Sequence, residues 1–356
     1  MSVGPQGEGV FFLISQPRAG STMVQRILGN HPSIHAVSEP WLLLHPMYAL
    51  QEEGIWTEYD ASIAWNARQG FLQCLPQGGE DYFEGLRRMY GYLYEQALAG
   101  SGKSHFLDKT PRYYQIIPQI HRLFPRAQFI ILLRNPLAVL CSVLRTWVKG
   151  SWPLLHRYKC DLLKAPKLLL EGINTLNESC VIVHYESFVR DPESEARKLC
   201  ASLGLDFVPD IIEYDESDPS SWQHGDKVGF RQHSRPDPQG ANKWVQDIED
   251  AQIWRLARDY LLFLGPDTVN EMGYAYDNLL DTLSTCRPSS IRLAATWPLW
   301  LLVNSLNWSE CSQILEHRTD QVLESLQRDG LRATWRKIVS QVAKQKRRRN
   351  ALPGLK

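Results

Sequence analysis

The sequence predicts an α/β fold in which a central parallel sheet carries helices on both faces. Four apolar segments, at residues 10–15, roughly 104–107, 128–133 and 180–184, have the length and composition of buried strands. Segments with helical periodicity separate them, and this alternation is typical of parallel sheets. The chain of 356 residues is 44% hydrophobic, which is enough for a substantial core in one or two domains.

The remaining elements follow from periodicity and composition. Amphipathic patterns predict helices at residues 81–99, 113–124, 154–176, 192–203 and 246–264. A further short strand is expected just before Glu39. Residues 215–243 are rich in Asp, Ser, Pro, Gly and Gln and indicate a long loop, which in a compact domain is usually functional.

The first chemically informative stretch is the loop after the first strand. Apolar residues 11–14 give way to a Gly and two hydroxyl residues, and apolar side chains then return at helical spacing from Met23 onward. A helix starting there directs unpaired backbone N–H groups and the positive end of its dipole at the loop. Arg18 adds a charge, and Ser21 and Thr22 add donors, so the pattern predicts a phosphate site.

This loop departs from the pattern of nucleoside triphosphatases, G-x-x-x-x-G-K-[ST]. Ser21 stands where the Lys belongs, and Ser15 replaces the first Gly. The pattern therefore favours a phosphate cradle for a nucleotide without a triphosphate. The alternative is an ordinary strand–turn–helix with no ligand, which is common in α/β proteins.

The second informative stretch is the end of the 128–133 strand. A triphosphatase carries an acidic Mg²⁺ ligand at or near that position, but here the strand delivers Arg134. Pro136 fits the first position of a helix, and Ser142 lies about two turns along it. Arg134 and Ser142 are positioned to hold one phosphate from two sides. Alternatively, Arg134 pairs with a carboxylate and Ser142 is a small buried residue.

Together these stretches resemble the PAPS-dependent sulfotransferases of the bacterial and carbohydrate type. Residues 16–22 resemble the 5′-phosphosulfate loop of that family, and residues 134–142 resemble its 3′-phosphate motif. Three further matches follow in the expected order along the chain: D-K-T-P at 108–111, H-Y-E-S-F at 184–188 with D-P at 191–192, and a late loop from 225 to 244. The resemblance covers roughly residues 10–265.

The resemblance implies a sulfotransferase fold like that of P-loop nucleoside triphosphatases. It also implies PAPS as co-substrate without a metal, and transfer of its sulfuryl group to a hydroxyl, less readily an amine, of a small molecule, carbohydrate or lipid. The donor-binding residues that it implies are Arg18, Ala19, Gly20, Ser21, Thr22, Met23, Arg134, Ser142, Tyr185 and Lys227. Other late-loop residues that remain open for the 3′-phosphate are Arg231, Arg235 and Lys243.

Two other classes of protein are alternatives to a sulfotransferase. A P-loop kinase is disfavoured by Ser21 in place of Lys and by Arg134 in place of an acidic ligand. A catalytically inactive nucleotide-binding relative is disfavoured because both phosphate motifs are intact.

The catalytic residues that the resemblance implies are Glu39, Lys109 and His233. Glu39 is the expected general base, because the His found after the Lys–Thr pair in phenol- and steroid-type members is absent here. Alternatively, Glu39 favours the N-terminus of a helix starting at Pro40. Lys109 is expected at the oxygen that bridges sulfate and phosphate, or else it pairs with Asp108. Two late-loop histidines, His233 and His224, are rival bases.

Composition restricts the partners and the compartment. The net charge is zero, so no nucleic-acid partner is expected. The seven cysteines include no C-x-x-C pair, which favours reduced thiols and a cytoplasmic location. Neither a signal peptide nor an N-terminal membrane anchor is expected from residues 1–9.

The sequence divides into a sulfotransferase domain at 1–283 and a C-terminal helical extension at 284–356. The apolar stretch at 293–306 is too short for a membrane span, and residues 309–346 have a helical pattern that ends in a basic run at 344–349. The simplest interpretation is a helical appendage with a solvated tail. The alternatives are a substrate lid, a homodimer contact or a peripheral membrane patch.

Overall fold

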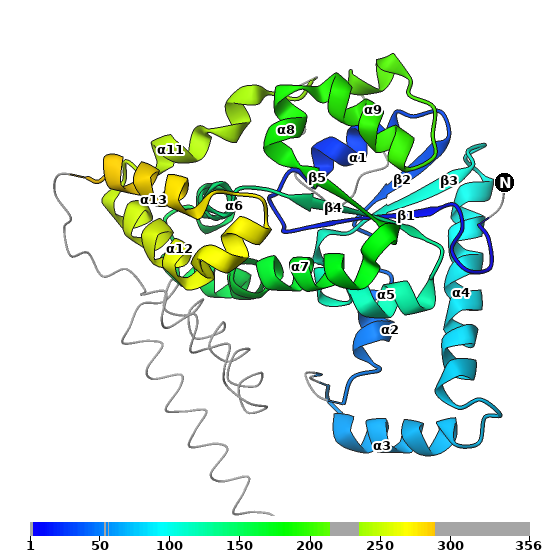
Figure 1. The fold of residues 1–356 in the computed structure, drawn as a ribbon. Coiled ribbons are helices and arrows are strands. Elements are labelled where there is room, and N and C mark those ends of the chain that lie inside the picture. Colours follow the sequence, from blue (N-terminus) through cyan, green and yellow to red (C-terminus); the bar gives the residue numbers. More distant parts are fainter. Residues whose placement is uncertain (1–2, 53–54, 56, 214–234, 289–356) are drawn as a thin grey trace, which may run out of the picture.

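A five-stranded parallel sheet forms the centre of the molecule, in the order β2-β3-β1-β4-β5. The computed structural model describes residues 3–52, 55, 57–213 and 235–288 (Figure 1). The strands are β1 Val10–Ser15, β2 Ile34–Ser38, β3 His105–Lys109, β4 Gln128–Leu133 and β5 Cys180–His184. The strands predicted from sequence are confirmed, and β3 runs on to Lys109.

Strand β1 lies at the centre because it can be buried on both faces. All six of its residues are buried, and Leu13 pairs with Lys109 of β3 on one side and with Ile130 of β4 on the other. Successive side chains of a strand point to opposite faces. Accordingly Phe12 packs into one core cluster and Leu13 into the other. Since all strands are parallel, their carboxyl ends meet at one edge of the sheet.

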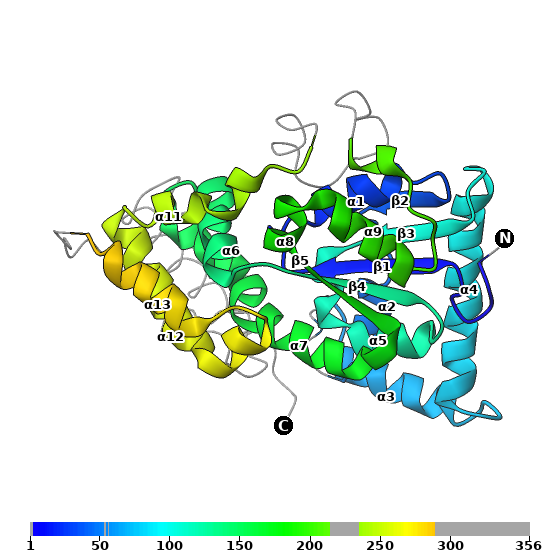
Figure 2. The same cartoon turned by 45° about the horizontal axis from the view of Figure 1, so that its top comes forward.

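Helices cover both faces of the sheet. Figure 2 shows α1, α8 and α9 over one face, and α5 and α7 run under the other face in Figure 1. The helices are α1 Ser21–Gly29, α2 Leu44–Tyr48, α3 Ala61–Leu72, α4 Gly79–Ala99, α5 Ile117–Leu123, α6 Pro136–Val143, α7 Ala165–Leu176, α8 Tyr185–Arg190, α9 Pro192–Ser202, α11 Lys243–Asp247, α12 Ala251–Glu271 and α13 Tyr276–Thr285. No helix of the described residues is long and apolar enough to span a membrane.

Several predicted helices are shorter or more irregular than their periodicity indicates. The 113–124 segment is a 3₁₀ turn, Pro111–Gln115, followed by α5. The 154–176 segment passes through 3₁₀ and π turns before α7 begins at Ala165. Prolines at 118 and 166 lie in the first turns of α5 and α7, where a missing N–H costs least.

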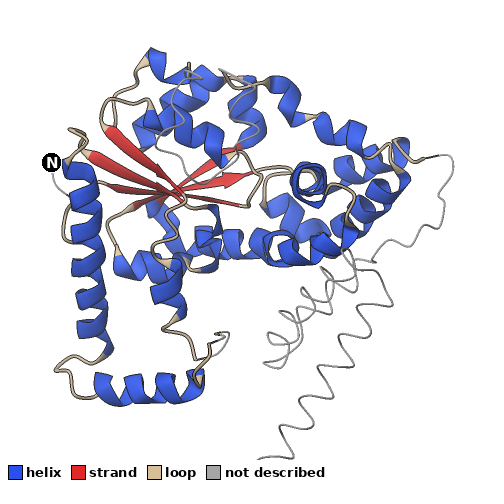
Figure 3. Cartoon of the chain, turned by 180° about the vertical axis from the view of Figure 1, so that it is seen from behind, coloured by secondary structure: helices blue, strands red, loops and turns tan. Residues whose placement is uncertain are grey.

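Helices α3 and α4, with the residue stretch that leads into them, form an arm that projects from the body (Figures 1 and 3). We define this arm as residues 57–99. The face of α4 that contacts the body buries Phe83, Tyr90, Tyr94 and Leu98, whereas α3 buries no side chain. A helix as short as α3 is marginally stable in water without packing. The Asp60 carboxylate caps its N-terminus by accepting hydrogen bonds from the N–H groups of Ser62 and Ile63.

Candidate active site

The loop between β1 and α1 brings Arg18 against helix α6. Its Nε donates to Ser142 Oγ at 3.2 Å and its Nη2 donates to Thr146 Oγ1 at 3.3 Å. Arg18 and Gly20 have φ of 73° and 102°, so the loop turns sharply before the first residue of α1. The orphan N–H groups of that first turn open toward the loop. The two predicted phosphate motifs, far apart in sequence, therefore meet.

Position 20 requires a glycine, because an aromatic ring lies where a side chain would begin. A Cβ built at this position would lie 2.5 Å from Cδ2 of Tyr185, the first residue of α8. The positive φ of Gly20 is also a backbone conformation that residues with a Cβ disfavour.

We expect Gly20→Ala to lower the free energy of unfolding by about 2 kcal/mol or more, since backbone strain and a clash add up. Gly102→Ala is the matched control, because Gly102 also has a positive φ of 68° but nothing lies within 4 Å of its added Cβ. Denaturant unfolding of both variants measures the difference. Equal losses in the two variants would show that the Tyr185 ring does not constrain the loop.

Arg134 lies at the end of β4, directly behind the same loop. Its Nη1 donates to the carbonyl of Arg18 at 3.0 Å and its Nη2 donates to the carbonyl of Gly240 at 2.8 Å. The guanidinium stacks on the ring of Tyr185 at 3.9 Å. The buried Nε has no hydrogen-bond partner among the described residues, and burial lowers the pKa of the guanidinium. A buried cation with an open donor is an incomplete site that an anion would complete.

Among the residues that the structure describes, no carboxylate forms an ion pair with Arg134, which was the predicted alternative. The nearest acidic side chain along α8, Glu186, accepts a hydrogen bond from the N–H of Asn135 at 3.0 Å. It accepts a second one from the hydroxyl of Tyr274 at 2.6 Å. Its two oxygens therefore hold the start of α6 and Tyr274, and its charge favours the charged form of Arg134 without a direct hydrogen bond.

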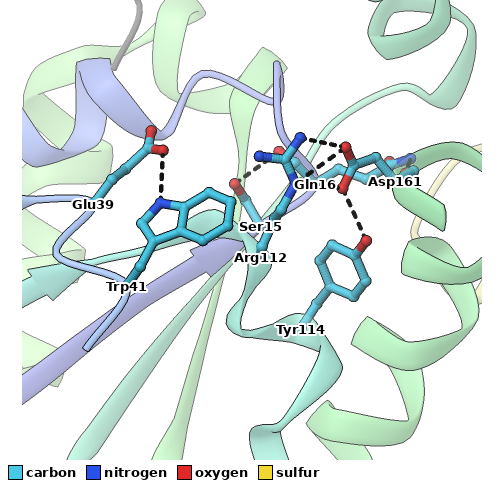
Figure 4. A network of polar contacts seen from close by, with 7 residues as sticks. All are labelled: Ser15, Gln16, Glu39, Trp41, Arg112, Tyr114 and Asp161. Atoms are coloured by element: carbon cyan, nitrogen blue, oxygen red, sulfur yellow. Dashed lines mark hydrogen bonds and ion pairs between the residues drawn. The ribbon is translucent and has the colours of Figure 1, made fainter. Parts of the chain in front are cut away.

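Glu39 and Lys109 meet at the ends of β2 and β3. These strands pair Ser38 with Lys109, so Glu39 follows directly beside the lysine. The fully buried Nζ of Lys109 lies 2.9 Å from Glu39 Oε1, and Trp41 Nε1 lies 3.4 Å from Oε2 (Figure 4). The Glu39 side chain keeps 19% of its surface exposed, which leaves it accessible to a small molecule.

Local backbone geometry excludes the alternative in which Glu39 sits at a helix N-terminus. Glu39 and Trp41 have φ of 50° and 54°, which helices do not accommodate. Helix α2 accordingly begins at Leu44 rather than at Pro40.

Asp108 is bonded to hydroxyl groups, and the ion pair of Lys109 is with Glu39. Its fully buried carboxylate accepts hydrogen bonds from the hydroxyls of Tyr94, Thr110 and Tyr113 at 2.7, 2.7 and 3.1 Å. Burial raises the pKa of this carboxyl group to about 6. Asp108 therefore belongs to a carboxylate–hydroxyl cluster, and the Lys109 charge, which lies 2.9 Å from Glu39, also acts on Asp108 and opposes this rise in its pKa.

A second polar group borders Glu39, and sequence reasoning missed it. The guanidinium of Arg112 donates to Asp161, at 2.6 Å from Nη2 to Oδ2, and Tyr114 donates to Asp161 Oδ1 at 2.9 Å (Figure 4). Arg112 also lies over the ring of Trp41, at 5.3 Å. Burial opposes the charge of Arg112, but the hydrogen bonds and charge of Asp161 prevail and raise the pKa of the guanidinium.

This group is joined to the phosphate loop. Gln16 Nε2 donates to the backbone carbonyl of Asp161 at 2.7 Å. The ring of Trp147 lies 5.5 Å from Arg18 Cζ and 5.9 Å from Arg112 Cζ. The Arg that follows D-K-T-P was the one available sequence signal for this group, since its partner Asp161 lies in the 154–176 segment, whose amphipathic pattern predicts an ordinary helix.

The remaining predicted residues either form local ion pairs or lie outside the described residues. The described late-loop cations are used locally, because Arg235 pairs with Glu213 at 3.6 Å and Lys243 pairs with Asp237 at 3.7 Å. Four predictions lie outside the described residues, namely those for His224, Lys227, Arg231 and His233. Within the described ranges, no group of three or more His, Cys, Asp or Glu residues could hold a metal ion.

Comparisons with known proteins point to one family. A model described as "Sulfotransferase family" matches residues 11–210. The chain is 30% identical over 218 residues to the nodulation protein NoeE of Sinorhizobium fredii (strain NBRC 101917 / NGR234), an alignment that covers 55% of this chain and 50% of NoeE. The chain thus spans half the length of that relative.

Two more distant similarities are also to proteins that carry the word sulfotransferase in their names. A putative protein-tyrosine sulfotransferase of Caenorhabditis briggsae is 23% identical over 216 residues, covering 59% of this chain and 70% of that protein. Among solved structures, the sulfotransferase domain from the curacin biosynthetic pathway aligns with a TM-score of 0.46 and 21% identity, over 66% of this chain and 90% of that domain.

Proposed function

Because the chain belongs to the sulfotransferase family, we propose that it transfers the sulfuryl group of PAPS to a hydroxyl group of an acceptor. The observation that carries this proposal is the juxtaposition of two clusters at the carboxyl edge of the sheet. Arg18, Ser142 and Arg134 form the first cluster, and Glu39 with Lys109 forms the second. One cluster suits the donor and the other suits the reacting hydroxyl.

The residues of the first cluster fit an adenosine 3′,5′-bisphosphate moiety. The first turn of α1 offers backbone N–H groups to the 5′-phosphosulfate, with the hydroxyls of Ser21 and Thr22 beside it. Arg18, Ser142 and the open Nε of Arg134 are the groups that we assign to the 3′-phosphate. The ring of Tyr185 is the surface that we assign to the adenine.

The second cluster supplies what in-line transfer requires. As the acceptor oxygen bonds to sulfur, its proton passes to Glu39, and the sulfur–oxygen bond to the phosphate breaks with its electron pair leaving on the bisphosphate. The Lys109 ammonium stabilises the negative charge that builds on the bridging oxygen. Such transfer depends on positioning and charge, so we propose that it runs without a metal ion.

The proposal also covers the class of acceptor and the cellular compartment. The ring of Trp41 is 39% exposed beside Glu39 and suits a sugar, lipid or other small molecule with a hydroxyl group better than an extended nucleic acid. The cysteines of the described residues are free thiols, which suits a cytoplasmic protein.

The decisive experiment is transfer of ³⁵S from labelled PAPS to acceptors in a cell extract, followed by mass spectrometry of the products. We expect transfer to persist in EDTA, because Ser21 and Arg134 replace the Lys and the acidic ligand that a Mg²⁺-triphosphate needs. A parallel reaction with γ-³²P-ATP and Mg²⁺ is the control for the kinase alternative. Transfer of phosphate, or sulfuryl transfer that stops in EDTA and returns with Mg²⁺, would contradict the mechanism.

A further inference from the structure

The guanidinium of Arg112 is bonded along one edge and open along the other. Its Nε donates to Asp161 Oδ1 at 3.0 Å, and its Nη2 donates to Oδ2 of the same carboxylate at 2.6 Å. Nη1 has no hydrogen-bond partner among the described residues and points away from Asp161 (Figure 4). The Arg112 side chain keeps 25% of its surface exposed, so this nitrogen is available to donate to a bound molecule.

Asp161 is a rigid support for this arginine. Its side chain is only 5% exposed, and Tyr114 donates to its Oδ1 at 2.9 Å. Its backbone carbonyl accepts a hydrogen bond from Gln16, the first residue of the loop proposed for the donor. The hydroxyl of Tyr260, on α12, donates to the carbonyl of Leu162 at 2.8 Å and holds the same π turn. A side chain held by such a support loses little freedom when it binds a ligand.

Arg112 lies between the two clusters that we assign to the donor and to the reacting hydroxyl. Its Cζ is 5.3 Å from the ring centre of Trp41, whose Nε1 is 3.4 Å from Glu39 Oε2 (Figure 4). The same Cζ is 5.9 Å from the ring centre of Trp147, which also lies 5.5 Å from Arg18. One indole ring contacts both Glu39 and Arg112, so a small acceptor whose hydroxyl meets Glu39 is within reach of Nη1.

Charge identifies the kind of group that Nη1 would bind. Lys109 is paired with Glu39, and Arg112 is paired with Asp161, so each of these cations already faces a carboxylate. Burial opposes the charge of Arg112, but Asp161 and, more weakly, Glu39 raise the pKa of its guanidinium, so both carboxylates act at this point. They would repel an anionic group of the acceptor. An uncharged oxygen accepts a hydrogen bond from Nη1 without that repulsion.

We propose that Arg112 determines acceptor specificity by donating from Nη1 to an uncharged oxygen adjacent to the reacting hydroxyl. The preferred acceptors are then neutral rings with two neighbouring hydroxyl groups, one for Glu39 and one for Arg112. Trp41, which is 39% exposed, suits the apolar face of such a ring. The inference rests on the proposed sulfuryl transfer with Glu39 as base, and Asp161 enters it as a positioning residue.

Three probes built on the same ring test this proposal, namely trans-cyclohexane-1,2-diol, cyclohexanol and trans-2-hydroxycyclohexane-1-carboxylate. Transfer of ³⁵S from PAPS to each probe is measured as kcat/KM. We expect the wild type to prefer the diol to cyclohexanol by about tenfold or more, which is the usual contribution of a hydrogen bond from a charged donor. The carboxylate should be a poorer acceptor than the diol by a similar factor.

Arg112→Met removes the donor and keeps an unbranched side chain beside the two indole rings. Its preference for the diol over cyclohexanol should fall to the ratio of their hydroxyl counts. Arg87→Met is the matched control, because Arg87 is 19% exposed, also pairs with a carboxylate, that of Glu84, and lies on α4. The control should keep the wild-type preference even where its unfolding stability falls.

Asp161→Asn tests the charge argument in a protein that retains Arg112. The amide keeps the shape of the side chain and removes the charge that compensates the guanidinium. We expect the carboxylate probe to gain about tenfold relative to the diol, because the guanidinium then attracts an anion. A purely structural effect of the substitution would slow all three probes alike, and so would contradict the assigned role of Asp161.

The proposal is overturned if the wild type shows no preference for the diol beyond the ratio of hydroxyl counts, or if Arg112→Met leaves that preference unchanged. A wild type that prefers the carboxylate probe would assign Arg112 to anion recognition instead. Transfer to acceptors of a cell extract, with none to the diol, would overturn this inference and leave the proposed function intact. Absence of transfer to any acceptor would overturn both.

Discussion

Glu39→Gln is expected to reduce turnover by about 10²–10⁴-fold, the usual contribution of a positioned general base. The amide keeps the shape of the side chain and removes its capacity to accept the acceptor proton. Binding of adenosine 3′,5′-bisphosphate should stay near that of the wild type, because the contacts proposed for the donor lie at Arg18 and Arg134 rather than at Glu39. Single-turnover rates and calorimetric titration measure the two quantities.

The ion pair with Lys109 requires a control for stability. Glu39→Gln leaves a fully buried ammonium without its carboxylate, which typically costs about 3–5 kcal/mol. Adding Lys109→Met removes that buried charge. The double variant should recover unfolding stability, which would show that the loss in Glu39→Gln comes from the buried charge. Its turnover should stay low, because Lys109 is itself proposed to act at the bridging oxygen, and recovery of turnover would remove both residues from the proposed mechanism.

His233→Ala decides between the two regions that offer a base. If this variant retains turnover while Glu39→Gln loses it, the base is the carboxylate at the end of β2. The opposite result would move the base to the late loop. Loss in both variants would indicate a coupled pair in which neither residue acts alone.

Arg134→Ala is expected to weaken binding of adenosine 3′,5′-bisphosphate by about tenfold to a hundredfold, since a charged hydrogen bond contributes about 1.5–3 kcal/mol. Binding of adenosine 5′-phosphate, which lacks the 3′-phosphate, should change much less. The two titrations must be compared, because Arg134 also holds the carbonyls of Arg18 and Gly240 and its removal loosens both segments. Equal weakening of the two nucleotides would assign Arg134 to loop positioning alone.

Much of the fold was predictable because its strands are short apolar runs with helical patterns between them. The meeting of the two predicted phosphate motifs was predictable for a related reason: both lie at strand ends, and parallel strands end at one edge. The meeting of Glu39 with Lys109 was not predictable from residues, since it depends on β2 pairing with β3 on one side of β1. Strand order is a property of long-range packing that local patterns do not carry.

The Arg112–Asp161 pair was missed for a different physical reason. Its two residues are separated by 49 positions, and Asp161 lies in a π turn between a 3₁₀ turn and α7. The amphipathic pattern of residues 154–176 predicts a regular helix there, so it does not mark Asp161 as a partner of Arg112. The predicted starts of two helices were too early, because the apolar pattern runs through Pro118 and Pro166 while the backbone before these prolines is 3₁₀ or π and becomes α-helical only in the turns that contain them.

The position of β1 at the centre of the sheet has a consequence for how this fold can diversify. The residues proposed for the donor follow β1 and β4, whereas Glu39, Lys109 and Arg112 lie at or just after the ends of β2 and β3, on the other side of β1. The proposed acceptor side is therefore encoded almost entirely by one uninterrupted stretch of chain, residues 34–114, which meets the donor side through the pairing of β3 with β1 and through Asp161. Exchange of that stretch between relatives, with the β3 positions that pair with β1 retained, is a route to new acceptors.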